Sequence, residues 1–203
     1  MTRMRWPVSV QVADGMDPQV VLRPLQRRDQ PAWEALRRDN AAYLTQWEPT
    51  PPDGVIARTP FGGYVRALNR DARAGTIVPF AVEVDGELAG QVHLFGIMRG
   101  SLLSGAAGYW LGERFAGRGI ATRSLAALID YAVGPLGLHR VEVNIRPENA
   151  ASLAVVAHLR LREEGVRRRY LHIDGDWRDH RSFALTVDEL EGRPAIQRWR
   201  PGG

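Results

Sequence analysis

Apolar and polar residues follow two different periods along this 203-residue chain, and each period indicates one kind of element. In residues 120–133 the apolar positions recur every three or four residues, which predicts an amphipathic helix that Gly134 and Pro135 end. In residues 140–145 apolar and polar positions alternate, which predicts a strand with one buried face. These two segments carry the clearest signals in the chain.

The same two patterns assign the remaining elements. Further strands are expected at 20–24, 77–84, 87–97, 105–111, 166–173 and 181–187, and further helices at 30–40, 59–72 and 150–161. Asp29 is expected to cap the first of these helices, and Asp85-Gly86 is typical of a hairpin turn. Antiparallel runs surround one strand-helix-strand crossover, so the predicted class is α+β. We expect a mixed, mostly antiparallel sheet of about seven strands flanked by helices.

No internal repeat or composition boundary divides the chain, so one domain is expected at residues 20–190. Residues 1–19 are expected to form an N-terminal extension with a short strand at 8–12. The Gly-, Pro- and Arg-rich residues 191–203 are expected to form a flexible tail. Because no apolar run is long enough for a membrane span or a secretory signal, we expect a cytoplasmic protein without a membrane partner.

The chain has no cysteine, and all 27 of its basic residues are arginine. This composition excludes disulfides, thiolate metal sites and a cysteine nucleophile, and it removes the lysine that a P-loop or a Schiff-base enzyme requires. The net charge of +4 favours anionic partners, but the arginines are spread along the chain, so no nucleic-acid site is expected. Asp179, His180 and His172 match no metal-ligand spacing, and no metal is expected.

The candidate chemistry lies between the strand that ends at 111 and the helix that begins at 120. The pattern Arg114-x-x-Gly117-x-Gly119 stands there, where glycines allow backbone N–H groups to approach a phosphate at a helix N-terminus. One alternative is an ordinary glycine hinge. Another is a dinucleotide fingerprint, which is disfavoured because Thr122 stands at the third glycine position and Glu142 lies in mid-strand.

Several motifs together resemble the GNAT superfamily of acetyl-CoA-dependent N-acetyltransferases. More narrowly, they are similar to the RimJ/RimL group, which acetylates the N-terminal residue of ribosomal proteins. The resemblance covers roughly residues 20 to 190 and rests on seven segments: Trp47-Glu-Pro49, Gly108-Tyr-Trp-Leu111, Arg114-x-x-Gly117, Gly117-Arg-Gly-Ile-Ala-Thr122, Leu138-His-Arg-Val-Glu142, Pro147-Glu-Asn-x-x-Ser152 and Tyr170-Leu-x-Ile-x-Gly-x-Trp-Arg-Asp-His180.

The resemblance implies that acetyl-CoA is the acetyl donor and that no metal takes part. It implies a sheet splayed at strands 105–111 and 140–145, where the thioester enters. It assigns coenzyme binding to these residues: Trp110, Leu111, Arg114, Ala116, Gly117, Arg118, Gly119, Ile120 and Asn149. It makes Ser152 and Tyr170 the candidate acids for the leaving thiolate, and it places Trp47 and Glu113 on the acceptor side.

The same resemblance leaves the acceptor half open. The position where some relatives carry an acid falls within three arginines at 167–169, and Glu113, His172 and Glu142 are the possible bases. A second departure is His158-Leu-Arg-Leu161, where the family usually has Leu-Gly-Phe. The leading hypothesis is transfer to a protein N-terminus, possible partners being ribosomal proteins. The alternatives are acetylation of a small amine and a weakly catalytic acyl-CoA-binding module. A monomer and a dimer are both open.

Overall fold

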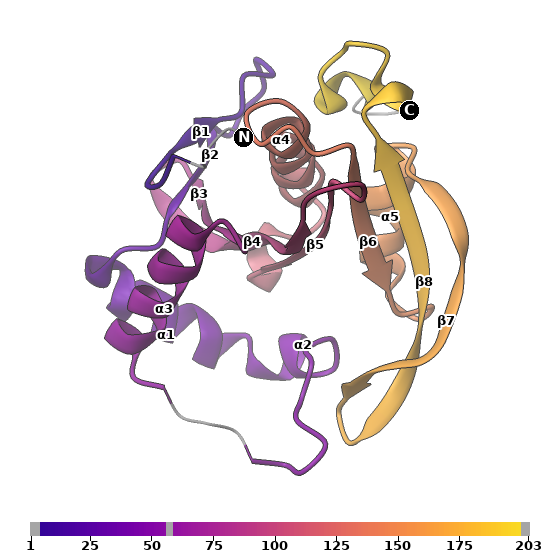
Figure 1. Ribbon diagram of the computed structural model, residues 1–203. Helices are drawn as coiled ribbons and strands as arrows, with labels where there is room; N and C mark the ends of the chain where they lie inside the picture. The colour runs from indigo at the N-terminus through magenta and orange to yellow at the C-terminus, as the bar shows by residue number, and fades with distance from the viewer. Residues whose placement is uncertain (1–4, 56–58, 200–203) are drawn as a thin grey trace.

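One mixed sheet of eight strands runs through the computed structural model, in the order β1-β2-β3-β4-β5-β6-β8-β7 (Figure 1). The structure describes residues 5–55 and 59–199. The strands are β1 Val10–Gln11, β2 Val20–Pro24, β3 Val78–Val84, β4 Glu87–Met98, β5 Ser104–Leu111, β6 Arg140–Ile145, β7 Arg162–Ile173 and β8 Asp176–Thr186. The α+β class is confirmed, and the short β1 raises the expected seven strands to eight.

The parallel pair β5–β6 is the one departure from antiparallel pairing among the described strands. Its register joins Ser104 to Arg140 and ends with Ala107 opposite Val143. Beyond that point β5 continues to Leu111, and β4 is its one partner there among the described strands. The predicted splay between these two strands is therefore confirmed.

The helices cover both faces of the sheet. Helices α1 Gln30–Asp39, α2 Ala41–Thr45 and α3 Phe61–Ala74 lie on one face, and α4 Ile120–Val133 and α5 Ala150–His158 lie on the other (Figure 1). Most side chains of α4 are buried, because the sheet packs on one side of it and the two ends of the described chain pack on the other. No helix among the described residues is long and apolar enough to cross a bilayer.

The expected cap at Asp29 is wrong. Asp29 already has helical dihedral angles and makes no side-chain capping bond to α1, because a short 3₁₀ turn precedes that helix. Its carboxylate instead accepts the Gln26 N–H at 2.7 Å and pairs with Arg23. By contrast, Asn149 caps α5 as predicted, accepting the Ser152 N–H at 3.0 Å.

The chain's described C-terminal end packs along α4. A 3₁₀ turn, η4 Ala195–Arg198, follows the outer face of α4, and the Ala195 N–H donates to Asp130 Oδ1 at 2.7 Å. The next residue, Trp199, packs against the hydrophobic core. The last four residues of the expected tail, 200–203, lie outside the described residues.

Candidate active site

The splay leaves one edge of β5 without a strand partner. From Gly108 to Leu111 the strand pairs with β4 on one side, while no residue of β6 pairs with it on the other. Main-chain N–H and C=O groups at such an edge can bond an extended ligand as an added strand would. The end of β5, including Trp110 and Leu111, therefore provides a main-chain binding edge inside the sheet.

A loop rich in N–H donors follows that edge. Gly117 and Gly119 both adopt left-handed conformations, with φ of 71° and 73°, and Gly119 is the N-cap of α4. Within the described residues, the N–H groups of Gly117, Arg118 and Gly119 donate to no other group. The first N–H groups of α4, starting at Ile120, lack intrahelical partners by helix geometry. These donors and the positive helix end form a site suited to a phosphate anion.

The groups of this loop differ in whether they are free to bind a phosphate. Arg114 pairs with Glu87, and its guanidinium lies 4.5 Å from the centre of the Phe115 ring, so it is turned away from the loop donors. Arg118 is exposed and remains available for a phosphate. The Ala116 N–H donates to Glu113 O within a 3₁₀ turn, so it is not a donor in this conformation.

The hydroxyl groups of Tyr109 and Ser152 lie close together on the α5 side of the splay. Burial raises the pKa of Tyr109 to about 12, and the nearby Ser152 side chain offsets part of that increase. The Tyr109 hydroxyl is buried and makes no well-formed hydrogen bond within the described residues. A buried hydroxyl without a hydrogen-bond partner costs free energy, and a ligand atom that bonds it removes this cost. Tyr109 and Ser152 are therefore suited to bind a ligand atom where β5 and β6 separate. Sequence reasoning identified Ser152 but missed Tyr109.

The opposite side of β5 faces α1 and is lined by stacked aromatic and arginine groups. The Arg37 guanidinium lies 5.1 Å from the Trp110 ring centre and 5.9 Å from that of Trp33. Its nitrogens bond both carboxylate oxygens of Glu48, one of them at 2.6 Å. The Trp110 side chain therefore belongs to the wall on the α1 side of β5, while its main chain belongs to the edge described above.

A hydrogen-bond network centred on Gln91 lies beside this wall. The Gln91 amide oxygen accepts from the Trp33 indole at 3.1 Å and from the Tyr64 hydroxyl at 3.3 Å. The amide nitrogen is therefore the group that donates to His93 Nε2 at 3.1 Å. Burial lowers the pKa of His93 to about 4, so the ring is neutral at physiological pH and carries its proton on Nδ1. Sequence reasoning missed this network because its two β4 residues, Gln91 and His93, belong to no recognisable motif.

Tyr170 lies on β7, where its ring packs edge-on against that of His180. Its hydroxyl accepts from Arg167 at 3.2 Å, and Arg167 in turn binds Glu142 at 2.7 Å. Arg140 occupies the other oxygen of Glu142 at 3.0 Å, so an arginine binds each carboxylate oxygen. This pairing makes Glu142 poorly suited to act as a base.

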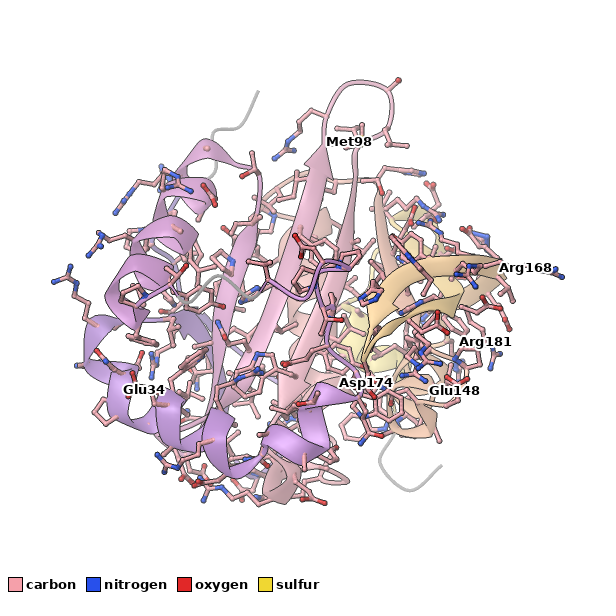
Figure 2. The ribbon with its side chains drawn as sticks, turned by 90° about the horizontal axis from the view of Figure 1, so that it is seen from below. Glu34, Met98, Glu148, Arg168, Asp174 and Arg181 are labelled. Carbon is pink, nitrogen blue, oxygen red and sulfur yellow. The ribbon has the colours of Figure 1, made fainter. Side chains whose placement is uncertain are left out.

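The loop after α2 joins the β7–β8 hairpin. Pro49 forms a bridge with Ile173, and the Thr50 hydroxyl lies 2.9 Å from His172 Nδ1, so His172 serves this junction. Figure 2 shows the tip of the hairpin, marked by Asp174, beside this part of the chain. Trp47 sits at the junction with its ring centre 5.3 Å from the Arg146 guanidinium. The junction therefore joins the segment after α2 to the β7–β8 hairpin and to the end of β6.

Glu113 stands at the start of the loop, with an exposed side chain. Its main-chain N–H donates to Asn40 Oδ1 at 2.7 Å, which ties the loop to the end of α1. No group of three metal-binding side chains occurs among the described residues.

Comparison with known proteins identifies the architecture. The family model described as "Acetyltransferase (GNAT) domain" matches residues 19–162. The structure of Mycobacterium smegmatis RimJ in complex with CoA-disulfide is 36% identical, covers 95% of this chain and 93% of that one, and superimposes with a TM-score of 0.84.

Two curated relatives extend the comparison. The [Ribosomal protein uS5]-alanine N-acetyltransferase of Escherichia coli (strain K12) is 28% identical over 178 residues, 86% of this chain and 87% of that protein. The protein named "Probable N-acetyltransferase YjcK" of Bacillus subtilis (strain 168) is 36% identical over 107 residues, which are 53% of this chain and 59% of that relative.

Proposed function

This chain belongs to the GNAT acetyltransferase family, and from that premise we propose that it acetylates the N-terminal α-amine of a protein, with ribosomal proteins as the acceptor class. It is an N-acetyltransferase whose donor is acetyl-CoA. The proposed acceptor is supported by the name of the E. coli relative and by the likeness to the mycobacterial RimJ.

The residues fit this donor in two places. The unpaired N–H groups at Gly117–Gly119 suit the pyrophosphate, and the free edge of β5 suits the amide-bearing pantetheine arm. The observation that carries the proposal is the gap between β5 and β6, because it lets the thioester lie between a donor side and an acceptor side. In this arrangement the amine nitrogen attacks the thioester carbonyl carbon, the carbon–sulfur bond breaks, and an amide forms.

Ser152 and Tyr109 are proposed to bond the departing thiolate, which takes up one proton. The amine gives up one proton, and only modest help is needed because an α-amine has a pKa of roughly 7.7–8.0. We therefore expect kcat/KM with an N-terminal peptide to rise with pH, to be half-maximal near about pH 8 and to level off above about pH 9. A lysine side-chain amine, with a pKa of about 10.4, is expected to be a poor acceptor at the same pH.

Charge pairing disfavours a polycationic acceptor. Glu48 is bound by Arg37, and Glu142 is bound by Arg140 and Arg167, so these carboxylates are already neutralised. A polyamine site needs carboxylates that are free to bind ammonium groups.

The test measures thiol release from acetyl-CoA with peptides that begin with Ala or Ser, the same peptides with blocked N-termini, and polyamines. Turnover with the free peptides alone supports the proposal. Turnover with polyamines but not with peptides contradicts the proposed acceptor. Binding of acetyl-CoA without any turnover favours an acyl-CoA-binding module.

A further inference from the structure

The described C-terminal end of the chain reaches the loop that suits the pyrophosphate. Trp199 follows η4 and places the benzo edge of its indole against Gly119. A Cβ atom added at Gly119 would lie 2.9 Å from Cζ2 of this indole and closer still to Cη2. Glycine at this position therefore serves the approach of an aromatic ring as well as the left-handed turn.

The position of the indole is fixed by hydrogen bonds of its neighbours. The Arg198 guanidinium donates to three main-chain oxygens, those of Leu159 at 2.8 Å, Arg160 at 3.0 Å and Glu189 at 2.5 Å. These acceptors belong to segments at the ends of α5 and β8. An arginine that satisfies three carbonyls holds the adjacent residue in place.

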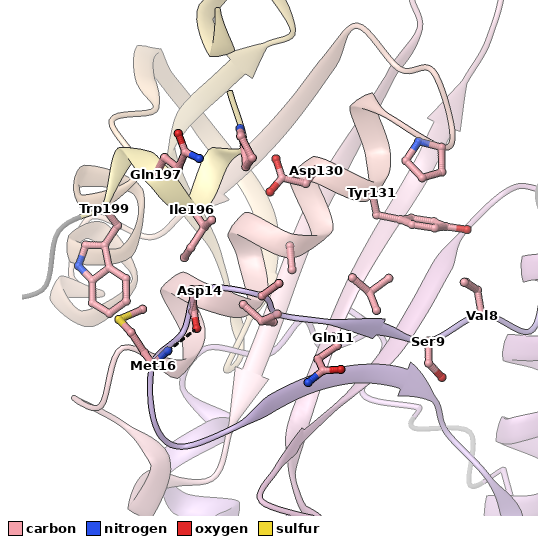
Figure 3. A pocket seen from close by; sticks show the side chains of 16 residues that line it. Val8, Ser9, Gln11, Asp14, Met16, Asp130, Tyr131, Ile196, Gln197 and Trp199 are labelled. Atoms are coloured by element: carbon pink, nitrogen blue, oxygen red, sulfur yellow. Dashed lines mark hydrogen bonds between the residues drawn. The ribbon is translucent and has the colours of Figure 1, made fainter. Parts of the chain in front are cut away.

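The indole itself is only partly used in packing. It is half-buried, and its N–H donates to no group within the described residues. It lines a cavity of about 790 Å³ between the N-terminal segment, α4 and the C-terminal segment (Figure 3). The His158 ring, at the end of α5, lies 6.0 Å from it with a 31° tilt. The indole therefore lies between the loop, which it touches at Gly119, and this cavity.

We propose that the Trp199 indole is the stacking surface for the adenine base of the co-substrate. The inference rests on the proposed binding of acetyl-CoA at this loop. With the pantetheine arm on the β5 edge, as proposed, the nucleotide half would extend from the other end of the loop, where the indole meets Gly119. Stacking of a base on tryptophan suits this place because it needs no precise hydrogen-bond pattern.

The test uses three probes on the whole protein by titration calorimetry: CoA, 4′-phosphopantetheine, which lacks the nucleotide, and adenosine 3′,5′-bisphosphate, which lacks the arm. In Trp199→Ala, we expect the dissociation constants for CoA and the bisphosphate to rise by about ten-fold, and that for 4′-phosphopantetheine to change by less than about two-fold. Trp199→Phe is expected to retain most of the affinity and Trp199→Leu to lose it, because the leucine keeps bulk without a π-face.

Trp177→Ala is the matched control, since Trp177 is also a partly exposed tryptophan, 43% exposed on the β7–β8 hairpin. It is expected to leave all three affinities unchanged. Thermal melting of each variant checks folding, and the contrast of Trp199→Phe with Trp199→Leu decides the matter where the alanine variant does not fold.

Equal losses of affinity for CoA and 4′-phosphopantetheine in Trp199→Ala would show that the indole only shapes the loop. This result would overturn the proposed stacking. Unchanged or tighter CoA binding in Trp199→Ala would overturn it as well. Both results leave the proposed function standing, whereas a wild-type protein that binds no CoA contradicts the proposed function too.

Discussion

Tyr109 and Ser152 are two hydroxyl residues whose roles depend on a neighbour from another element. Tyr109 comes from β5 and Ser152 from the first turn of α5, and they meet only because α5 packs beneath the splay. Since the cap of α5 uses the main-chain N–H of Ser152, its hydroxyl stays available for chemistry.

The Ser152→Ala variant tests this role. We expect kcat to fall by about ten- to a hundred-fold, because the thiolate loses a hydrogen-bonding group, while the cap and the CoA dissociation constant stay nearly unchanged. Steady-state kinetics and CoA titration measure the two effects. Ser124→Ala is the control, since Ser124 is a serine on α4 whose buried hydroxyl has no hydrogen-bond partner among the described residues. A normal kcat in Ser152→Ala would contradict the assignment.

His93 makes stability depend on pH. Its pKa falls from 6.5 to about 4 on folding, so the unfolded chain binds more protons between these values. The free energy of unfolding is therefore expected to decrease as pH drops from about 6.5 toward about 4, by at most about 1.4 kcal/mol per pH unit from this residue. Urea denaturation at about pH 5 and about pH 7 measures the slope.

The His93→Gln variant is expected to flatten that slope, because it removes the titrating group. His139→Gln, at a residue whose side chain is 46% exposed, is expected to leave it as in the wild type. If the free energy of unfolding of His93→Gln still depends on pH as in the wild type, another group causes the loss of stability at acid pH.

At the scale of elements, the glycine loop depends on backbone conformation. Gly119→Ala is expected to raise the CoA dissociation constant by about ten-fold or more. A residue with a side chain costs roughly 1–2 kcal/mol in the left-handed region, and the new Cβ meets the Trp199 ring. Gly137 has φ of 62°, and among the described residues no atom lies within 4 Å of an added Cβ. Gly137→Ala should therefore lower stability by a similar backbone cost and leave CoA binding intact. Equal losses of CoA affinity in the two variants would show that the effect of Gly119→Ala does not come from the loop itself.

Most elements could be predicted from the sequence, because their periods are set by the faces they bury. Helix α4 and strand β6 match their predicted bounds, whereas α5 ends at His158 rather than 161. The early end follows from Arg160, whose left-handed φ of 52° cannot continue a helix. Strand β7 begins at Arg162, earlier than expected, because an edge strand with exposed charged residues gives no alternating apolar signal.

The site could be predicted only where local chemistry defines it. Gly117, Gly119 and Asn149 follow from turn and capping rules. Tyr109, His93 and Trp199 could not be found that way, because each depends on residues far away in the sequence. The splay itself was expected from the family resemblance, since no periodicity reveals where two strands separate.

At the scale of the whole molecule, a buried ion pair holds the N-terminal segment on α4. The Arg123 side chain is 2% exposed and bonds Asp14 at 2.6 and 2.9 Å, Pro18 O at 2.7 Å and Met16 O at 3.0 Å. We expect Asp14→Ala to lower the free energy of unfolding by about 3–5 kcal/mol, because it leaves a buried cation without its counter-ion. Urea denaturation measures this loss.

Arg70→Ala removes one partner of an ion pair in which the Arg70 side chain is 72% exposed. It is expected to change stability by less than about 0.5 kcal/mol. A comparably small loss in Asp14→Ala would mean that the N-terminal segment contributes little to the fold.

The separation of β5 from β6 also bears on solubility. An unpaired strand edge is normally a place where protein chains associate and aggregate, and many proteins protect such edges with charges or bulges. Here the open edge lies in the middle of the sheet, with β6, β8 and β7 beyond it and helices on both faces. A strand of another sheet cannot pair along an edge that lies inside this one, whereas a slender extended ligand can. The molecule therefore keeps an unpaired backbone edge for the proposed donor without exposing it at the rim of the sheet.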